Sequence, residues 1–271
     1  MSQTVPIFVS IPHSGEKVPM QTPWLMNLPE EILMADVDRY VDIIYQPSLK
    51  HLQIPFLTTE WHRYAVDLNR VPTDVDELSV EGAPKKAGAH PDGYHWVMTK
   101  NEIKLMYAPM TEVCHQELTH LIYEPFHQSI RNHYDIFRRQ GFKNIFHIDA
   151  HSMPSLGTRM HKDPGERRAD IVISDCQGQS CAAEFRDLVI AAYTISGFKV
   201  GYNWPYLGGR VTEQYGHPEQ GQHAIQVELN RSLYMDEKTK KLESFHEQVQ
   251  SKISKAMEYI KSELPNLNLA K

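Results

Sequence analysis

The sequence predicts an α/β protein built on a mixed, mostly parallel β-sheet that is covered by helices on both faces. Short apolar, β-branched runs alternate along the chain with longer segments whose apolar residues recur at helical spacing. No internal repeat, low-complexity tract or linker separates two cores. A single α/β domain can reach about 250 residues, so we expect residues 1–271 to form one domain.

Seven short apolar runs predict the strands. The first, VPIFVSI, is ended by Pro12, and NIFHIDA leads directly into His151. The predicted strands are residues 5–11, 54–59, 65–68, 144–150, 170–174, 198–202 and 221–230.

Four longer segments predict helices. Pro29 suits the first turn of the first helix, Pro109 and Pro125 are expected to interrupt the second, and Gly141 ends it. The predicted helices are residues 29–52, 101–140, 180–196 and 237–263. Residues 71–98 and 152–168 are rich in Gly and Pro and predict loops. A loop as long as 71–98 is usually functional or mobile.

Composition excludes several classes of function. With 28 Lys and Arg against 34 Asp and Glu, the net charge is −6, which argues against nucleic acid as a partner. Three cysteines without a CxxC pair exclude a disulfide framework and a cysteine-built zinc site. The sequence shows no signal peptide, and no apolar run approaches the roughly 18 residues of a membrane span. We therefore expect a cytoplasmic protein without a membrane segment.

Polar side chains gather where the predicted strands end, which is where open α/β sheets carry their catalytic residues. Alternation along one strand places His147, Asp149 and His151 on a single face. Four clusters share this position: HSGE at 13–16, DLNR at 67–70, HIDAHS at 147–152 and QVELN at 226–230.

Each cluster also has an ordinary structural explanation, such as a hydrogen-bonded core histidine or a turn arginine. Their coincidence at one edge of one sheet favours chemistry, because buried polar groups are costly unless they are paired or bind a metal. Two histidines and a carboxylate are a usual ligand set for catalytic zinc, with water in the fourth position. A nearby glutamate suits general base catalysis, and an arginine suits a substrate carboxylate.

Five segments together resemble the N-formylglutamate amidohydrolase family. They occur in order from about residue 5 to residue 236, so they cover nearly the whole chain. The segments are VSIPHSG, AVDLNR, HIDAHSMPS, RRADIVISD and LGGRVTEQYGHPEQGQHAIQVELNRSLYM. The family is distantly similar to the zinc carboxypeptidases and aspartoacylases, so the resemblance implies a zinc-carboxypeptidase-like fold.

The resemblance also implies roles for individual residues. His13 and His151 become the histidine ligands of one zinc ion, and the third ligand is either Glu16 or Asp38, the latter on the predicted helix 29–52. Glu228 becomes the general base.

The resemblance also bears on the substrate contacts. Asn69 and Arg70 become the clamp for the substrate carboxylate, and Arg210 can grip a second carboxylate or shift the substrate away from formylglutamate. Asp149 is placed to orient a ligand imidazole, as metal-bound histidines usually require. His62, His90, His95 and His161 lie in loops at the same edge and are candidates for substrate contact.

The function implied is hydrolysis of a small-molecule N-acyl amino acid. N-formyl-L-glutamate is the first candidate, giving formate and glutamate in the closing step of one route of histidine degradation. Two alternatives stay open: a carboxypeptidase- or aspartoacylase-like hydrolase acting on another carboxylate-bearing amide, and a non-catalytic relative that binds a metal or a ligand. No oligomeric state follows from the sequence.

Overall fold

A six-stranded sheet forms the centre of the computed structural model, which describes residues 4–84 and 93–269. Part of the predicted loop 71–98 therefore lies outside the described residues. The strands pair in the order β2-β1-β3-β6-β4-β5. Their bounds are Phe56–Thr58 (β2), Ile7–Ile11 (β1), Ile145–Met153 (β3), Gln222–Asn230 (β6), Ile171–Ser174 (β4) and Val200–Tyr202 (β5).

The sheet is mixed and mostly parallel, as predicted. Strands β2, β1, β3 and β6 run in the same direction, whereas β4 pairs antiparallel with β6 and parallel with β5. The carboxyl ends of β1, β3 and β6 therefore lie at one edge, beside the amino end of β4. In the register of β3 and β6, His151 lies opposite Glu228.

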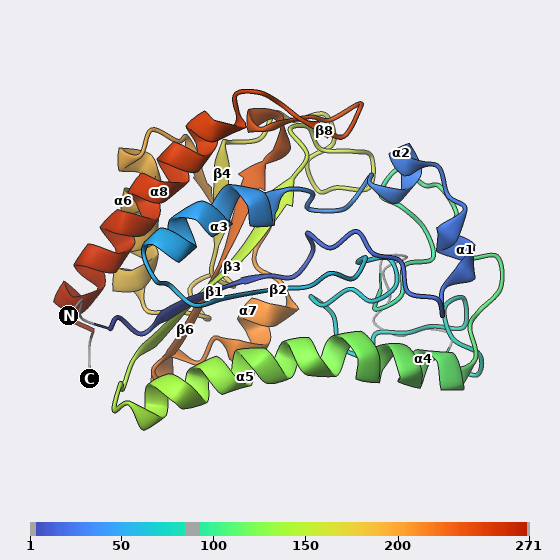
Figure 1. Ribbon diagram of the computed structural model, residues 1–271, viewed down its shortest axis with the longest axis horizontal. Helices are drawn as coiled ribbons and strands as arrows, with labels where there is room; N and C mark the ends of the chain where they lie inside the picture. The colour runs from blue at the N-terminus through green and yellow to red at the C-terminus, as the bar shows by residue number, and fades with distance from the viewer. Residues whose placement is uncertain (1–3, 85–92, 270–271) are drawn as a thin grey trace.

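Helices cover both faces of the sheet, which confirms the predicted α/β architecture (Figure 1). On one face, α3 (Val41–His51), α6 (Ala183–Ile195) and α8 (His246–Glu263) pack together over an apolar core. On the other face lie α5 (Glu124–Arg139), drawn along the lower edge of Figure 1, and α7 (Arg210–Tyr215).

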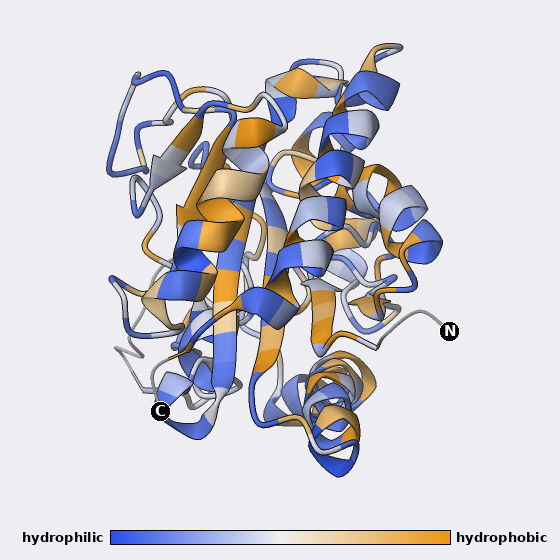
Figure 2. Cartoon of the chain, turned by 90° about the vertical axis from the view of Figure 1, so that its left-hand side faces the viewer, coloured by the Kyte–Doolittle hydropathy of each residue, from blue (hydrophilic) through white to orange (hydrophobic). Residues whose placement is uncertain are grey.

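Alternation along the central strands divides apolar from polar side chains. On β3, Ile148 and Ala150 join the core under α3, α6 and α8. His147, Asp149 and His151 point to the opposite face, where they are buried as well. Figure 2 shows the resulting bands of hydrophobic and hydrophilic residues along the strands. The polar residues at the carboxyl ends therefore belong to one face of the sheet.

The predicted helix at 29–52 is wrong as a continuous element. The chain forms α2 (Glu30–Leu33), leaves the helical path, and enters α3 only after Tyr40, whose φ is 70°. The intervening segment is fixed by the Asp38 backbone N–H, which donates to the His13 carbonyl at 2.9 Å. Asp38 thus lies on a loop held against the end of β1, where helical periodicity does not apply.

Two further expectations are corrected. Residues 65–68 are buried but form no strand, because their backbone bonds go to the neighbouring loop, as in Asp67 N–H to the Tyr94 carbonyl at 2.8 Å. The second helix begins only at α4 (Glu112–Leu118), where the Thr111 side chain caps the first turn. A π-helical turn (Thr119–Tyr123) then joins α4 to α5 just before Pro125.

The last predicted helix starts later than its periodicity suggested. Residues 237–245 precede α8, and β7 (Met235–Asp236) and β8 (Lys241–Leu242) form a small antiparallel hairpin there. The remaining short elements are α1 (Pro23–Met26), η2 (Pro218–Gln220), η3 (Arg231–Leu233) and η4 (Leu264–Asn266). Within the described ranges, no helix is both long and apolar enough to cross a membrane.

Candidate active site

A polar cavity of about 390 Å³ opens at the carboxyl edge of β1, β3 and β6. This volume lies within the usual range for small-molecule sites. His13 reaches it from the turn after β1, His151 from β3 and Glu228 from β6. The parallel strands therefore bring together residues that lie far apart in the sequence, as the strand-end clusters predicted.

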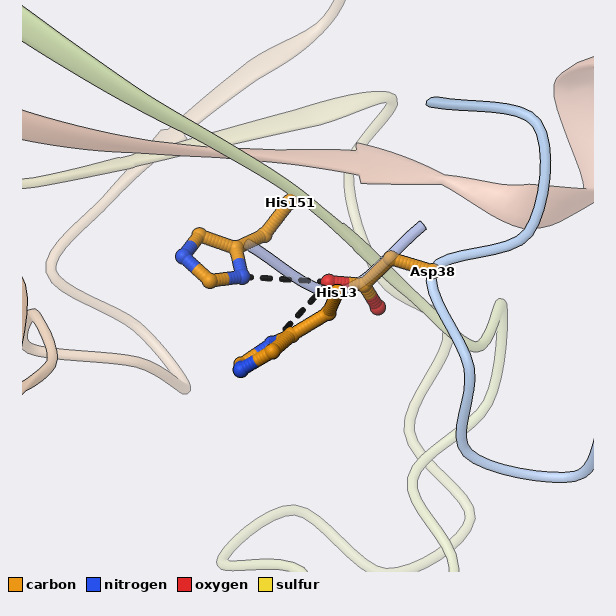
Figure 3. Close-up of side chains that lie close together, drawn as sticks. All are labelled: His13, Asp38 and His151. Carbon is orange, nitrogen blue, oxygen red and sulfur yellow. Dashed lines mark hydrogen bonds and ion pairs between the residues drawn. The ribbon is translucent and has the colours of Figure 1, made fainter. Parts of the chain in front are cut away.

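A buried cluster of His13, Asp38 and His151 lies in the wall of this cavity. The Nδ1 atoms of His151 and His13 lie 3.0 and 3.5 Å from the same oxygen, Oδ2 of Asp38. Figure 3 shows the two imidazole rings converging on this carboxylate, His151 from β3 and His13 from the turn after β1. The three side chains are at most 3% exposed, so bulk water does not screen them.

Each histidine is held from behind by a second carboxylate. Asp67 Oδ1 lies 2.9 Å from His13 Nε2, and Asp149 Oδ2 lies 2.7 Å from His151 Nε2. These contacts fix the orientation of both rings and leave both Nδ1 atoms facing Asp38. Asp149 thus contacts His151 in the way expected of a residue that orients a ligand.

The other oxygen of Asp38, Oδ1, faces two arginines. Arg231 Nη2 donates to it at 3.0 Å, and Arg63 Nη1 lies 3.8 Å away. Ser152 Oγ also donates to Oδ1 at 3.2 Å. The carboxylate is therefore divided, with Oδ1 bound by cationic and hydroxyl donors and Oδ2 presented to the histidines.

The charges of the cluster agree with this arrangement. Burial alone would raise the pKa of Asp38, but the adjacent imidazoles of His13 and His151 and the charge of Arg63 hold that pKa well below its usual value. Burial opposes the charged form of His151, yet the Asp149 carboxylate raises the pKa of this imidazole well above its usual value.

Glu228 differs from the other carboxylates of the cavity. Burial raises its pKa to about 7, and the charge of His151 lowers it only in part. Gln226, two residues earlier on β6, donates from Nε2 to Glu228 Oε1 at 2.8 Å and lines the same cavity. A buried glutamate with a pKa near neutrality can both take and release a proton.

The donor set fits a divalent metal ion. One donor atom from each of His13, Asp38 and His151 lies within 4.8 Å of the others. His13 Nδ1 is buried and has no hydrogen-bond partner among the described residues, as expected of an atom reserved for a ligand. Two imidazoles and one carboxylate are a usual set for catalytic zinc.

Of the two carboxylates expected as the third ligand, the cluster contains Asp38. Glu16 lies outside it, because its side chain binds Arg39 with Oε1 at 2.7 Å from Nε. Glu16 is also 39% exposed. The pattern HxxE therefore does not bring its glutamate to the cluster.

The predicted substrate-binding residues fall in two places. Asn69 and Arg70 line the cavity, and Asn69 Oδ1 also accepts a hydrogen bond from the Val211 backbone N–H at 2.8 Å. Arg210 does not belong to the cavity lining. Its guanidinium lies 3.1 Å from Glu213 and 3.6 Å from Asp74.

The loop histidines also separate. His161 lines the cavity. His62 and His95 do not line it, and each is buried with a backbone carbonyl as a partner. His90 lies outside the described residues.

Sequence reasoning missed the contacts of Asp67 and Arg231 with the cluster. Asp67 is part of the DLNR segment, and its place two residues before Asn69 was the available signal. Arg231 follows β6 by one residue, but its contact with Asp38 depends on the fold of a distant loop. No spacing in the sequence reveals that contact.

The fold and the cavity define a class of protein. It is an α/β protein with two histidines and one carboxylate buried at the carboxyl edge of parallel strands, in a geometry that fits a metal ion. The family model of N-formylglutamate amidohydrolase matches residues 5–235. The chain therefore belongs to the N-formylglutamate amidohydrolase family.

Curated relatives agree with this family. The chain is 30% identical over 244 residues to an N-formylglutamate deformylase of Pseudomonas aeruginosa, covering 86% of this chain and 83% of the relative. It is 29% identical over 240 residues to an N-formylglutamate deformylase of Pseudomonas putida, with the same coverage.

Solved structures share the fold. A crystal structure of N-formylglutamate amidohydrolase from Ralstonia eutropha matches with a TM-score of 0.86 at 24% identity, covering 98% of this chain and 96% of that chain. A protein of Agrobacterium tumefaciens matches with a TM-score of 0.69 at 16% identity, covering 96% and 89%.

Proposed function

We propose that this protein is a zinc-dependent amidohydrolase that cleaves N-formyl-L-glutamate to formate and glutamate. One observation carries the proposal: His13, Asp38 and His151 form a buried donor set beside Glu228 in a cavity of small-molecule size. The curated relatives suggest the substrate, since both are N-formylglutamate deformylases.

His13 and His151 would hold the metal through Nδ1, and Asp38 through Oδ2. Asp67 and Asp149 keep both rings in the orientation that this requires, through their contacts with Nε2. A zinc ion bound there lowers the pKa of a coordinated water and polarises a carbonyl group.

Glu228 acts as the general base and then as the general acid. It takes a proton from the attacking water as the water oxygen bonds to the formyl carbon. It then delivers that proton to the amide nitrogen as the carbon–nitrogen bond breaks, releasing formate and the free amine of glutamate. The pKa of about 7 suits both transfers near neutral pH.

Asn69 and Arg70 hold the α-carboxylate of the substrate. Both line the cavity, and a guanidinium matches the planar geometry of a carboxylate. Arg210 is not part of this proposal, since its guanidinium is paired with Asp74 and Glu213 outside the cavity.

A panel of N-acyl amino acids tests the proposal directly. The purified protein is stripped with a chelator, reloaded with zinc, and assayed for release of formate or of the free amine. We expect zinc-dependent turnover that is fastest with N-formyl-L-glutamate. Faster cleavage of a different acyl group would favour the carboxypeptidase- or aspartoacylase-like alternative. Stoichiometric zinc without turnover would favour a binding protein.

The pathway and the location of the protein stay predictions. We predict that the reaction is the closing step of one route of histidine degradation, which yields formate and glutamate. We predict a cytoplasmic location as well.

A further inference from the structure

The cations of the cavity wall differ in their partners. Arg63 pairs with Asp67 at 2.9 Å and Arg231 pairs with Asp38 at 3.0 Å, so both are neutralised within the protein. Lys240 lines the same cavity and is half-buried. Among the described residues, its ammonium group has neither a hydrogen bond nor an ion pair.

The backbone of Lys240 is fixed in an unusual conformation. It lies at the end of the turn between β7 and β8 with a φ of 57°, in the left-handed region that favours glycine or asparagine. Its carbonyl accepts from Arg39 Nη1 at 2.8 Å and from the Tyr40 hydroxyl at 3.2 Å. The backbone conformation does not favour a lysine at this position, so a role of the side chain is a better reason for its presence.

Charged groups of both signs surround Lys240. Burial lowers the pKa of its ammonium group and the Arg231 charge lowers it further, whereas the charges of Glu237, Asp36 and Asp236 raise it. Glu237 itself is engaged, because its two oxygens accept from the backbone N–H and the hydroxyl of Ser155. A partly buried ammonium group without a direct partner is costly, and an incoming carboxylate would relieve that cost.

We propose that Lys240 binds the second carboxylate of the substrate and so selects N-acyl derivatives of acidic amino acids. The inference rests on the proposed function and extends it. Arg70 follows Asp67, which contacts His13, whereas Lys240 lies on the segment beside Arg231, which contacts Asp38. Arg70 and Lys240 thus both line the cavity but reach it on different segments, so each can bind one carboxylate of a dicarboxylate substrate.

The test compares two substrates of the same length and shape. N-formylglutamate carries the second carboxylate, and N-formylglutamine carries a neutral amide in its place. With Lys240→Met, kcat/KM for N-formylglutamate should fall about 10- to 100-fold, mainly through KM, because a charged hydrogen bond is lost. The value for N-formylglutamine should change by less than about threefold. Lys241→Met, at the exposed neighbouring lysine, should leave both values unchanged.

Two outcomes would overturn the inference. An equal loss with both substrates would show a structural role for Lys240, and unchanged kinetics with both would show no contact with the substrate. Lys240→Arg should restore part of the preference, since the charge is kept.

Binding by calorimetry separates this inference from the proposed function. It is measured for both compounds with the Lys240→Met change and without it, in a Glu228→Gln background that slows turnover. Selective weakening of N-formylglutamate binding supports the role of Lys240 even if neither compound is hydrolysed. Absence of hydrolysis by the zinc-loaded wild type would count against the proposed function alone.

Discussion

Asp38 shows how single atoms prepare this site. Its Oδ1 atom is bound by Arg231 and Ser152, while Oδ2 faces the two histidines. Burial favours the protonated form of a carboxyl group, whereas cations and hydrogen-bond donors favour the ionised form. The donors around Asp38 therefore keep it ionised, and because the arginines and Ser152 bind Oδ1, Oδ2 is left available to a metal ion.

Replacing Glu228 with glutamine tests the assignment of the base. The glutamine side chain is nearly isosteric but cannot accept a proton from water. We expect bound zinc to remain stoichiometric by elemental analysis, while kcat falls by about two to four orders of magnitude. Retained turnover would show that another group activates the water. Loss of zinc would instead make Glu228 a ligand.

Arg231→Lys tests how Asp38 is positioned. Lysine keeps the positive charge but loses the planar group that also donates to the carbonyl oxygens of Ala35 and Asp36. We expect zinc affinity, measured by competition with a chelating dye, to fall about 10- to 100-fold, as for other groups that orient metal ligands. Arg186→Lys, at a pair with Asp187 on α6, is the control and should keep the wild-type affinity. Equal affinities in all three proteins would contradict the positioning role.

The sequence allowed three residues of the candidate site to be placed together, and their roles stay predictions. His13, His151 and Glu228 stand at strand ends, and parallel strands bring such ends together. The choice between Glu16 and Asp38 did not follow from spacing, because it depends on how the loop before α3 folds back onto the His13 carbonyl. No local pattern pointed to Lys240. It lies in the turn between β7 and β8, a segment that the predicted helix 237–263 included.

At the scale of elements, strands were predictable because their apolar faces repeat every two residues. The bounds of helices were harder to predict, because loops that pack against a core also carry apolar residues and can imitate helical spacing. Residues 65–68 are buried without pairing to any strand, and residues 34–40 interrupt a helical pattern at the place where Asp38 is needed. The elements that were predicted wrongly therefore lie next to the candidate site.

The first turn of α7 depends on one glycine. A Cβ atom at Gly209 would overlap the Asn69 carboxamide, whose Oδ1 accepts from the Val211 backbone N–H. Gly209→Ala should therefore displace Asn69, raise KM about tenfold or more, and lower the free energy of unfolding by about 1–3 kcal/mol. Kinetics and denaturant unfolding measure the two effects. Gly201→Ala in β5 is the control, because its added Cβ meets only an ordinary contact at 3.4 Å. Wild-type kinetics in Gly209→Ala would mean that Asn69 does not contribute to the site.

At the scale of the whole molecule, both faces of the sheet are packed, and several histidines are buried in them as neutral groups. His62 and His223 each accept a hydrogen bond at Nδ1 from a backbone N–H and contact an oxygen through Nε2. In His127, Nε2 donates to the Leu68 carbonyl and Nδ1 contacts the Tyr215 hydroxyl. Protonation of His62 or His223 would place two N–H groups against each other.

This burial predicts a steep loss of stability in acid. Burial lowers the pKa of His62, His127 and His223 from 6.5 to about 4. Between pH 6.5 and pH 4, these histidines therefore bind protons in the unfolded chain but stay neutral in the folded protein. The contribution of the three neutral histidines to the free energy of unfolding is complete above pH 6.5. It is lost as the pH falls toward 4, at up to about 1.4 kcal/mol per pH unit for each histidine.

Denaturant unfolding of the chelated protein between pH 7 and pH 4.5 measures this slope without a contribution from metal release. His127→Gln should reduce the slope by about one proton, since glutamine does not titrate. His120→Gln is the matched control, because the His120 side chain is 70% exposed, and it should leave the slope unchanged. If unfolding free energy stayed constant from pH 7 to pH 5, the folded protein would have to accept these protons. The hydrogen bonds that hold the three rings neutral would then have to open without cost, which their burial opposes.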